Sequence, residues 1–488
     1  MHSNQYIFFY ILLLFLTSCA THTHNTPARN QARPNVLMIA VDDLNHWVSH
    51  LGRNPQAITP NIDRLAARGM SFHRAYAPSA ICNATRAAMM SGMRPSTTGI
   101  YENNIHWRSV IGEGYTLPNF FREQGYYVAG GGKIFHNNSY RESEWESYYS
   151  HKSRKQLEGT DAKAKQQGKS LSYKASILPI EEFAGGDDTV IDYHVAKWAA
   201  KELSKKHTRP FFIAAGIFRP HLPWAVPKKY FDLYPEEDIQ LPPYNANDLD
   251  DLPNDNKIDP IHAQILAENS WKKAIRAYLA SITYADIQVG RILDALDKSR
   301  YRDNTIVVLW GDHGWHLGEK LRWRKFALWE EATRTPYIWV APGVTKAGSK
   351  TDTAVDLQSL WPTLAALVGA PLPQHVEGQS ILELLDDPDA PWTIPALTTQ
   401  GFNNHAIRST RYRYIKYNRG TKEFYDHAND PYEWTNLAEN QASAAIMSEL
   451  DQWIPKVNRR HREAAKLYNG ESWYAGKNYK EVRKAGRR

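Results

Sequence analysis

The stretch PNVLMIAVDDL, residues 34–44, decides the fold class. It is a run of apolar, largely branched residues that ends in two adjacent carboxylates, Asp42 and Asp43. A strand that is apolar at every position is buried on both faces, which is typical of the parallel sheets of α/β proteins. Ligands of such sheets bind beyond the carboxyl ends of the strands. The stretch therefore predicts a buried strand with both carboxylates at a functional edge.

Strand and helix patterns alternate through most of the chain. The helix pattern TPNIDRLAARG (59–69) follows the first strand, and NTIVVLWGDHG (304–314) is another buried strand after a long helix pattern. From about Pro395 the residues alternate instead, as in HAIRSTRYRYIKYN (405–418), which indicates antiparallel strands. We expect an α/β fold with a large, mixed but mostly parallel sheet flanked by helices, plus a small C-terminal antiparallel-sheet subdomain.

Four parts make up the expected domain organisation. Residues 1–19 are a leader, because their apolar run is too short to cross a bilayer. A polar tether covers 20–33, the main domain 34–394, and the small subdomain 395–488. The leader ends in LTSC, which resembles a bacterial lipobox with Cys19 as the lipidated residue. We expect export to the periplasm or surface of a Gram-negative bacterium, with a lipid anchor in the outer membrane; plain secretion with loss of Cys19 is the alternative.

Composition narrows the class of partner. The chain is 42% hydrophobic and 23% charged, which is typical of a globular protein. Its net charge of +7 and its 12% aromatic content suit a polyanionic or carbohydrate partner. The alternative is a solvated basic surface with the aromatic residues in the core.

Polar clusters follow three of the predicted strands and should meet at one edge of the sheet. Adjacent carboxylates repel each other unless a cation pairs with them, and several carboxylates favour Ca²⁺ over Zn²⁺. Any one cluster could instead consist of helix-capping Asp residues and a histidine that is hydrogen-bonded within the protein. The three clusters together favour a metal site. The clusters are Asp42 with Asp43, Asp312 with His313, and Lys133 with His136.

Cys82, in SAICNATRAAMMSG (79–92), marks a second centre. A leader that ends at Cys19 would leave Cys82 without a disulfide partner, since the chain has two cysteines. It precedes a short predicted helix, and Arg86 lies one turn further on. Free N–H groups at such a junction stabilise negative charge. The alternative is a buried cysteine that acts as a small hydrophobic residue.

CNATR, residues 82–86, resembles the Cys-x-Pro/Ala-x-Arg signature of the type I sulfatases, whose cysteine is oxidised to Cα-formylglycine. VLMIAVDDL, TPNIDRLAARG, GGKIFH, RPHLPW, GDHGWHLGE and DPYEWTNLAEN occur in the family's order between about Pro34 and Asn440. The motifs are most similar to the iduronate-2-sulfatase branch. Ala84 stands where Pro is commoner and Thr85 where Ser is usual. The resemblance implies an alkaline-phosphatase-like fold and a sulfuric ester hydrolase.

A ligand set and a nucleophile follow from this resemblance. Formylglycine made from Cys82 would be hydrated to a gem-diol. One hydroxyl would attack sulfur, and the bond from sulfur to the alcohol would break so that the alcohol leaves. Loss of a proton from the second hydroxyl would then expel sulfate and restore the aldehyde. The resemblance implies Ca²⁺ held by Asp42, Asp43, Asp312, His313 and residue 82.

The remaining catalytic roles are also implied by the resemblance. Arg86 would stabilise the diol, while Lys133 and Lys325 would bind the sulfate oxygens. His136 would take the diol proton, and His221 would protonate the leaving oxygen.

Loop residues close to these motifs are candidates for substrate contact. A sugar ring can stack on Trp, and Arg can pair with a sulfate or carboxylate in a bidentate manner. Packing and surface solvation are the alternatives. The candidates are Trp107, Arg108, Trp315, His316, Arg322 and His405.

The expected function is removal of sulfate from a sulfated carbohydrate. An oligosaccharide from an algal polysaccharide or a glycosaminoglycan fits, and the iduronate branch implies exo action on a 2-O-sulfate. The other expected partners are a formylglycine-generating or anaerobic sulfatase-maturating enzyme and a membrane reached only through lipid; no nucleic acid is expected. A phosphodiesterase or phosphonate monoester hydrolase of the same fold, and a glycan-binding lipoprotein without turnover, are the alternatives.

Overall fold

A computed structural model describes residues 33–150, 171–172, 178–253 and 258–474 of the 488-residue chain. After the first 33 residues the chain forms one compact unit. The leader, Cys19 and the tether up to residue 32 lie outside the described residues, so these predictions stay untested, as does the boundary at residue 395. Within the described ranges, no helix combines the length and the apolar character that crossing a membrane requires.

The central sheet has eight strands in the described part of the chain, in the order β13-β2-β12-β9-β1-β7-β3-β4. β1, the strand predicted from residues 34–44, pairs in parallel with β7 and β9. β12 runs antiparallel to both of its neighbours, so the sheet is mixed but mostly parallel, as predicted. The strands are β1 Asn35–Val41, β2 Met70–Tyr76, β3 Tyr127–Gly132, β4 Ser147–Tyr149, β7 Phe211–Ile217, β9 Thr305–Gly311, β12 Tyr337–Val340 and β13 Ser349–Asp356.

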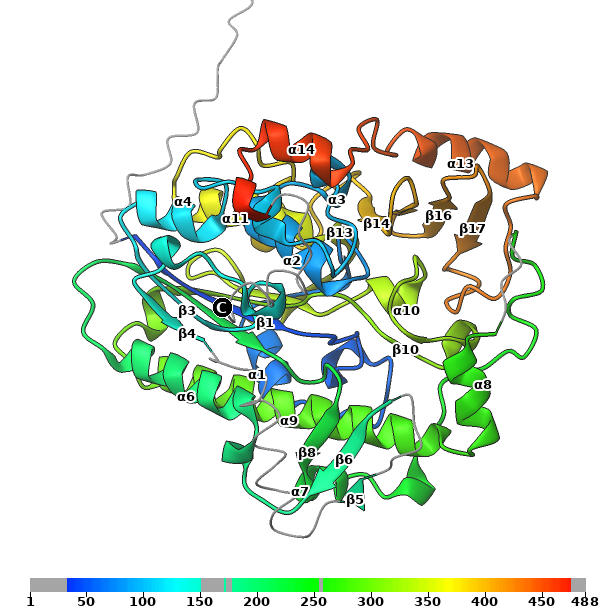
Figure 1. Cartoon of the computed structure of the whole chain (residues 1–488), viewed down its shortest axis with the longest axis horizontal. Coiled ribbons are helices and arrows are strands. Elements are labelled where there is room, and N and C mark those ends of the chain that lie inside the picture. Colours follow the sequence, from blue (N-terminus) through cyan, green and yellow to red (C-terminus); the bar gives the residue numbers. More distant parts are fainter. Residues whose placement is uncertain (1–32, 151–170, 173–177, 254–257, 475–488) are drawn as a thin grey trace, which may run out of the picture. The chain divides into compact units, whose positions relative to one another are not determined.

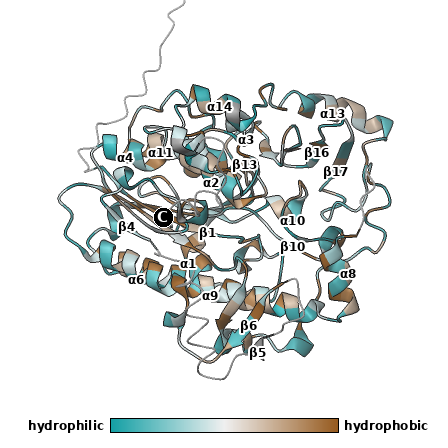
Figure 2. Ribbon diagram, in the orientation of Figure 1, coloured by the Kyte–Doolittle hydropathy of each residue, from teal (hydrophilic) through white to brown (hydrophobic). Residues whose placement is uncertain are grey.

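Residues of β1 alternate between two hydrophobic cores. Leu37 and Ile39 pack with helices α1, α6 and α9, whereas Val36 and Met38 pack with α2, α4 and α11. The two groups of helices lie on opposite sides of the sheet (Figure 1), and the strands between them are predominantly hydrophobic (Figure 2). This burial on both faces explains the unbroken apolar run. The helices are α1 Pro60–Arg68, α2 Cys82–Ser91, α4 Leu117–Glu123, α6 Ile191–Ser204, α9 Trp271–Asp297 and α11 Leu360–Leu367.

A small antiparallel sheet follows, as the alternating residues predict. Its strands pair in chain order: β14 Ala396–Thr399, β15 His405–Arg408, β16 Tyr412–Lys416 and β17 Lys422–Asp426. Leu397 on one face packs against Leu450 of helix α13 (Ala444–Asp451). Ile415 on the other face belongs to a cluster with Trp329, which precedes helix α10 (Glu330–Thr333). The small sheet is thus packed against a loop of the main domain.

Shorter elements complete the described structure. Two further sheets are present, β5-β6-β8 and the hairpin β10-β11. Their strands and the remaining helices are β5 Leu171–Ser172, β6 Ile180–Phe183, β8 Trp224–Pro227, β10 His316–Leu317, β11 Trp323–Arg324, α3 Pro95–Thr98, α7 Lys228–Phe231, α8 Pro260–Ala267, α12 Leu382–Asp386 and α14 His461–Leu467.

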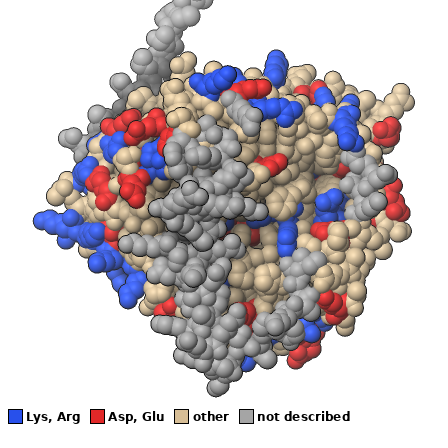
Figure 3. Space-filling model, viewed as in Figure 1, with Lys and Arg blue, Asp and Glu red and all other residues tan. Residues whose placement is uncertain are grey.

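Charged side chains of both signs are mixed on the surface. On the face drawn in Figure 3, Lys and Arg side chains lie among Asp and Glu side chains. The net charge of +7 therefore does not by itself identify a binding face.

Candidate active site

Four neighbouring strands of the central sheet, β9-β1-β7-β3, bring the predicted polar residues to one edge. These strands are parallel, so their carboxyl ends coincide. The residues that follow them are Asp312 and His313 after β9, Asp42 and Asp43 after β1, His221 after β7, and Lys133 and His136 after β3. The sequence prediction that these clusters meet at one edge is therefore confirmed.

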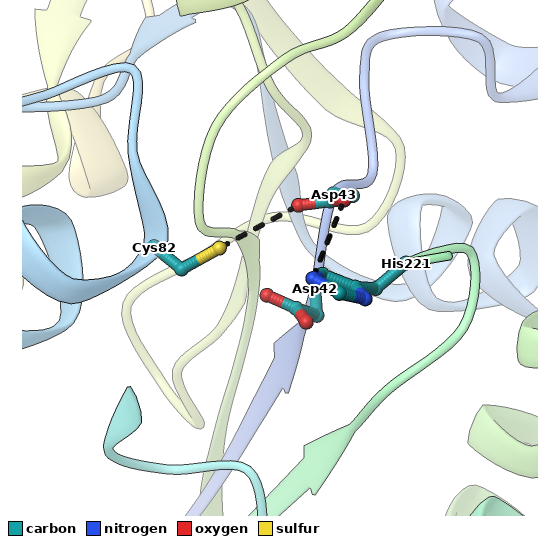
Figure 4. Close-up of side chains that lie close together, drawn as sticks. All are labelled: Asp42, Asp43, Cys82 and His221. Carbon is teal, nitrogen blue, oxygen red and sulfur yellow. Dashed lines mark hydrogen bonds and ion pairs between the residues drawn. The ribbon is translucent and has the colours of Figure 1, made fainter. Parts of the chain in front are cut away.

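Cys82 is the first residue of α2 and lies within this group (Figure 4). Its Sγ atom is 2.9 Å from Nζ of Lys325, 3.3 Å from Nε2 of His313 and 3.7 Å from Oδ1 of Asp43. Nε2 of His221 lies 4.0 Å from the other oxygen of Asp43. The thiol is completely buried and forms no disulfide. The carboxylates that were predicted to bind a metal ion and the signature cysteine thus lie in one site.

Buried cations pair with the acids. Arg86 donates from Nε to Asp312 (2.9 Å) and from Nη2 to Asp42 (3.1 Å), and the side chains of all three are fully buried. Lys133 also pairs with Asp42, and Lys325 Nζ lies 2.5 Å from Oδ1 of Asp43. Arg86 therefore holds the acids together, while its predicted contact with a diol at residue 82 stays a prediction.

The three carboxyl groups differ in pKa because their neighbours differ. Burial alone would raise the pKa of Asp42, but Lys133 and further cations hold it well below its usual value. Burial would also raise the pKa of Asp43, but the charge of Lys325 outweighs this effect and the pKa is lowered. For Asp312, burial and then the charge of Asp42 raise the pKa to about 8. The negative charge of an ionised Asp312 is therefore poorly balanced by the cations of the protein alone.

Imidazole groups in the site are held with one nitrogen toward its centre. Nδ1 of His313 lies 2.9 Å from the carbonyl oxygen of Gly314, to which it donates, so Nε2 faces Cys82. Nδ1 of His221 donates to the carbonyl oxygen of Leu222 in the same way, at 2.5 Å. Burial, and then the charge of Lys133 or Lys325, lower the pKa values of His136, His221 and His313. All three are therefore neutral near pH 7.

These residues fit a hard divalent cation. Ligand atoms of two sets lie within 4.8 Å of one another, Asp42-Asp43-Cys82-His221 and Cys82-Asp312-His313. Oδ2 of Asp43 is buried without a hydrogen-bond partner, and Asp312 has a raised pKa. A dication would satisfy the oxygen and offset the repulsion between the acids. Carboxylate oxygens favour Ca²⁺, although an imidazole ligand is unusual for it.

Lys325 reaches the site from a strained loop. Its neighbours Arg324 and Phe326 have φ values of 70° and 73°, in the left-handed region that side chains rarely adopt. The side chain of Lys325 is buried, whereas Phe326 is 46% exposed. The backbone N–H of Phe326 donates to the carbonyl of Ala80, two residues before Cys82. This loop thus carries both a site cation and an exposed aromatic ring.

Four of the residues predicted to contact substrate are core residues, which corrects that expectation. The indole of Trp107 stacks on Phe135 at 4.3 Å and donates to Ser139. Each of the four side chains is packed against protein atoms and buried, so none presents a surface to a sugar. The corrected residues are Trp107, Trp315, His316 and His405. Trp315 packs beside a site residue instead, because Nζ of Lys325 lies 5.3 Å from the centroid of its ring.

The other two residues predicted to contact substrate, Arg108 and Arg322, have different surroundings. Nε and Nη2 of Arg108 donate to the two carboxylate oxygens of Glu471, each at 2.6 Å, so this bidentate face of the guanidinium is already engaged. Arg322 lines a cavity of about 160 Å³ together with Phe326, Asn404 and Tyr417. Contact between Arg322 and substrate stays a prediction.

Sequence reasoning missed most of this cavity wall. Asn404 follows the turn at Gly401, and Tyr417 precedes the turn at Gly420; both glycines have positive φ. Glycine and asparagine mark these turns in the sequence. No local pattern places them beside the loop at Phe326, because that depends on how the small sheet packs.

Two family models match the chain. The model described as Sulfatase matches residues 34–370. The model described as N-sulphoglucosamine sulphohydrolase, C-terminal, matches residues 311–460. Together they cover the central sheet, the site at its edge and the small antiparallel sheet.

Individual proteins agree with this assignment. A sulfatase of Formosa agariphila is 37% identical over 486 residues, covering 92% of each chain. The human iduronate 2-sulfatase is 33% identical over 386 residues and 70% of each chain. In fold, the chain resembles the phosphonate monoester hydrolase of Agrobacterium radiobacter, with a TM-score of 0.70, 20% identity and coverage of 86% of this chain and 94% of that one. The alkaline-phosphatase-like fold and the similar sulfatases show that this chain belongs to the sulfatase family and is a sulfuric ester hydrolase.

Proposed function

We propose that this protein hydrolyses the sulfate esters of a sulfated saccharide, with formylglycine derived from Cys82 and a bound Ca²⁺ as its cofactors. The observation that carries the proposal is the position of Cys82. It lies against Asp43, His313 and Lys325 at the carboxyl edge of the sheet. This proximity supports the assignment of the acids and the signature cysteine to a single reaction centre.

The thiol itself is a poor nucleophile in this setting. Burial raises the pKa of Cys82 far above its ordinary value, although Lys133 and Lys325 act in the opposite direction. A thiol that stays protonated lacks the reactive thiolate form. Oxidation to formylglycine removes this difficulty, because its hydrated form would supply a hydroxyl nucleophile.

The charges around residue 82 are suited to a sulfate group. Lys133 and Lys325 are buried ammonium groups that bind anionic oxygens as point charges. When a sulfate ester is bound, they would stabilise negative charge on its oxygens and hold the sulfur against residue 82. Asp42, Asp43, Asp312 and His313 would hold Ca²⁺, which would supply further positive charge to the sulfate.

Proton transfer would fall to the two other histidines. His136 is neutral because of burial and the charge of Lys133, so it can accept a proton. The side chain of His221 is 34% exposed, in contrast to the buried acid Asp43 beside it. This partly exposed position suits a group that protonates a leaving saccharide oxygen. A bound anionic sulfate would raise the pKa of His221 and favour its protonated form.

The similarity to the human iduronate 2-sulfatase supports a saccharide substrate. We propose an oligosaccharide derived from a glycosaminoglycan or an algal polysaccharide, with a 2-O-sulfate at its end. The test is sulfate release from a panel of defined sulfated oligosaccharides that differ only in the sulfated position. Release from none of them would contradict the proposal.

Phosphate ester hydrolysis is a second candidate, favoured by the similarity in fold to a phosphonate monoester hydrolase. Phosphate and sulfate esters are similar in size, and the buried cations suit either anion. Aryl sulfate, aryl phosphate diester and aryl phosphonate substrates should be assayed side by side. We expect sulfate release to dominate; dominant phosphate or phosphonate turnover would overturn the sulfatase proposal.

Maturation and export are part of the proposal. Because Cys82 is fully buried, a maturase would have to reach it before the chain folds. The lipobox-like LTSC supports lipid attachment at Cys19 and an anchor in the outer membrane of a Gram-negative bacterium. Mass spectrometry of the N-terminal peptide from native membranes tests the anchor, and an unlipidated N-terminus would contradict it.

A further inference from the structure

Two adjoining cavities lie beside the Cys82 site. The first, of about 160 Å³, is the one lined by Arg322 and Phe326. The second, of about 400 Å³, shares Asn404 and Tyr417 with the first and adds Arg419. A cavity of several hundred Å³ is in the range that holds a small organic ligand. The two cavities are therefore neighbours that share part of their walls.

The first cavity is directly connected to the loop that carries Cys82. Phe326 donates its backbone N–H to Ala80, and Gln400 accepts a hydrogen bond from Ser79 at 3.5 Å. The N–H of Thr399 also donates to the carbonyl of Pro78. Both walls of the first cavity are thus fastened to residues 78–80. A ligand held there would contact Phe326, the residue that follows Lys325 of the Cys82 site.

The second cavity extends away from this loop, along the turns of the small sheet. Phe402 forms part of its wall, with the guanidinium of Arg460 4.5 Å from the ring centroid. Asn404 and Asn418 join the two turns, since the N–H of Asn418 donates to Oδ1 of Asn404 at 2.9 Å. The hydroxyl of Tyr417 donates to Glu423 at 2.8 Å. These bonds hold the wall in place before a ligand binds.

The chemistry of the lining suits an acidic sugar. Exposed aromatic surface at Phe326 can stack on a sugar ring, and the amides of Gln400, Asn404 and Asn418 can bond to hydroxyl groups. Among the residues that the structure describes, no Asp or Glu lines either cavity. Arg419 is exposed, and its guanidinium forms no ion pair with a described residue.

We propose that the two cavities bind the saccharide unit next to the one that bears the scissile sulfate, and that Arg419 pairs with an acidic group on this neighbouring unit. The inference rests on the sulfatase function proposed above and specifies its substrate as an oligosaccharide with a second anionic group. Arginine suits this role because its planar fork pairs with either a carboxylate or a sulfate. Phe326 and Tyr417 would then flank the sugar between the two anions.

The test compares sulfated disaccharides on the matured full-length enzyme. One carries a carboxylate on the neighbouring unit, the second has that carboxylate reduced to an alcohol, and the third carries a sulfate in its place. We expect Arg419→Gln to lower kcat/KM for an acidic disaccharide by about 10-fold or more relative to the neutral one, which corresponds to loss of a charge-assisted hydrogen bond. The acidic disaccharide with the larger drop identifies the group that Arg419 binds.

Lys422→Gln is the matched control. Lys422 is an exposed cation on β17, three residues from Arg419, and does not line either cavity. Its loss should leave the ratio of acidic to neutral kcat/KM unchanged. Sulfate release with an unchanged ratio in Arg419→Gln would overturn this inference alone. No sulfate release from any disaccharide or aryl sulfate by aldehyde-containing enzyme would overturn the proposed function, and this inference with it.

Discussion

Nζ of Lys325 lies 2.9 Å from Sγ of Cys82. The same ammonium group is 2.5 Å from a carboxylate oxygen of Asp43, so one buried cation joins the signature cysteine to the acidic cluster. The nearby acids raise the pKa of Lys325 despite its burial, and the group stays charged. A fixed positive charge beside residue 82 suits the role proposed for Lys325 in binding a sulfate group.

Replacement of this ammonium group should impair catalysis. We expect Lys325→Met to lower kcat/KM for an aryl sulfate by about 10²–10³-fold, the usual loss when one preorganised charge is removed. Lys325→Arg should not restore it, because a planar guanidinium does not fit the space of a point charge. Lys346→Met, at an exposed lysine, is the control. Steady-state sulfate release measures the effect, and activity within 3-fold of the parent would contradict this role.

The role of His221 predicts a dependence on the leaving group. His221→Gln should lower kcat by ~10²–10⁴-fold for a saccharide sulfate, whose leaving oxygen needs a proton. The loss should be much smaller for a nitrophenyl sulfate, because a nitrophenolate leaves without a proton. His194→Gln serves as the control, since the side chain of His194 bonds to the backbone of Asp188 outside the site. Equal losses on both substrates would show that His221 is not the acid.

Calcium should stabilise the folded protein. A ligand that binds only the native state adds about 2.7 kcal/mol at 100 times its Kd, so Ca²⁺ should raise Tm and a chelator should reverse the rise. Asp312→Asn should reduce this shift, whereas Asp303→Asn, at a fully solvent-exposed acid, should preserve it. Calorimetric melting with and without Ca²⁺ is the measurement. The metal assignment fails if the two variants respond alike.

The raised pKa of Glu319 predicts how the stability of the folded protein depends on pH. Burial, and then the charge of Glu331, raise the pKa of Glu319 to about 8. An unfolded glutamate ionises near pH ~4.3, so between roughly pH 4.3 and 8 the unfolded state has lost a proton that the folded state retains. The contribution of Glu319 to the free energy of unfolding therefore falls as pH rises through this window.

Glu319→Gln removes this ionisation and retains an acceptor for the N–H of Leu317. We expect the variant to match the parent near pH 4.5 and to be more stable at pH 8, as measured by denaturant unfolding. Glu237→Gln, at an exposed glutamate, should show no such divergence. A constant difference between Glu319→Gln and the parent at both pH values would contradict the assignment.

The central strands and the core of the site could be predicted from the sequence. After their first residues, Asn35 and Thr305, β1 and β9 have no polar side chain because helices cover both faces. Asp42 and Asp312 stand directly after these strands. Parallel strands bring such residues together without further information. β13 was not predicted, since its SKTDTAVD sequence has the polar residues of an edge strand.

Contacts between distant loops could not be predicted. Trp107 and His405 lie near recognisable motifs, yet packing against Phe135 and a hydrogen bond with Thr399 make them core residues. The wall that holds Arg419 depends on how the small sheet meets the loop at Phe326. Burial and loop packing of this kind arise from tertiary structure and leave no local pattern.

The most direct test of the proposed mechanism relates the state of residue 82 to turnover. Preparations made with increasing amounts of a formylglycine-generating enzyme should contain increasing fractions of aldehyde, measured by mass spectrometry of the peptide that contains Cys82. Sulfate release per mole of protein should rise in proportion to the aldehyde fraction and extrapolate to zero when residue 82 is entirely a thiol. Full turnover by an all-thiol preparation would contradict the account.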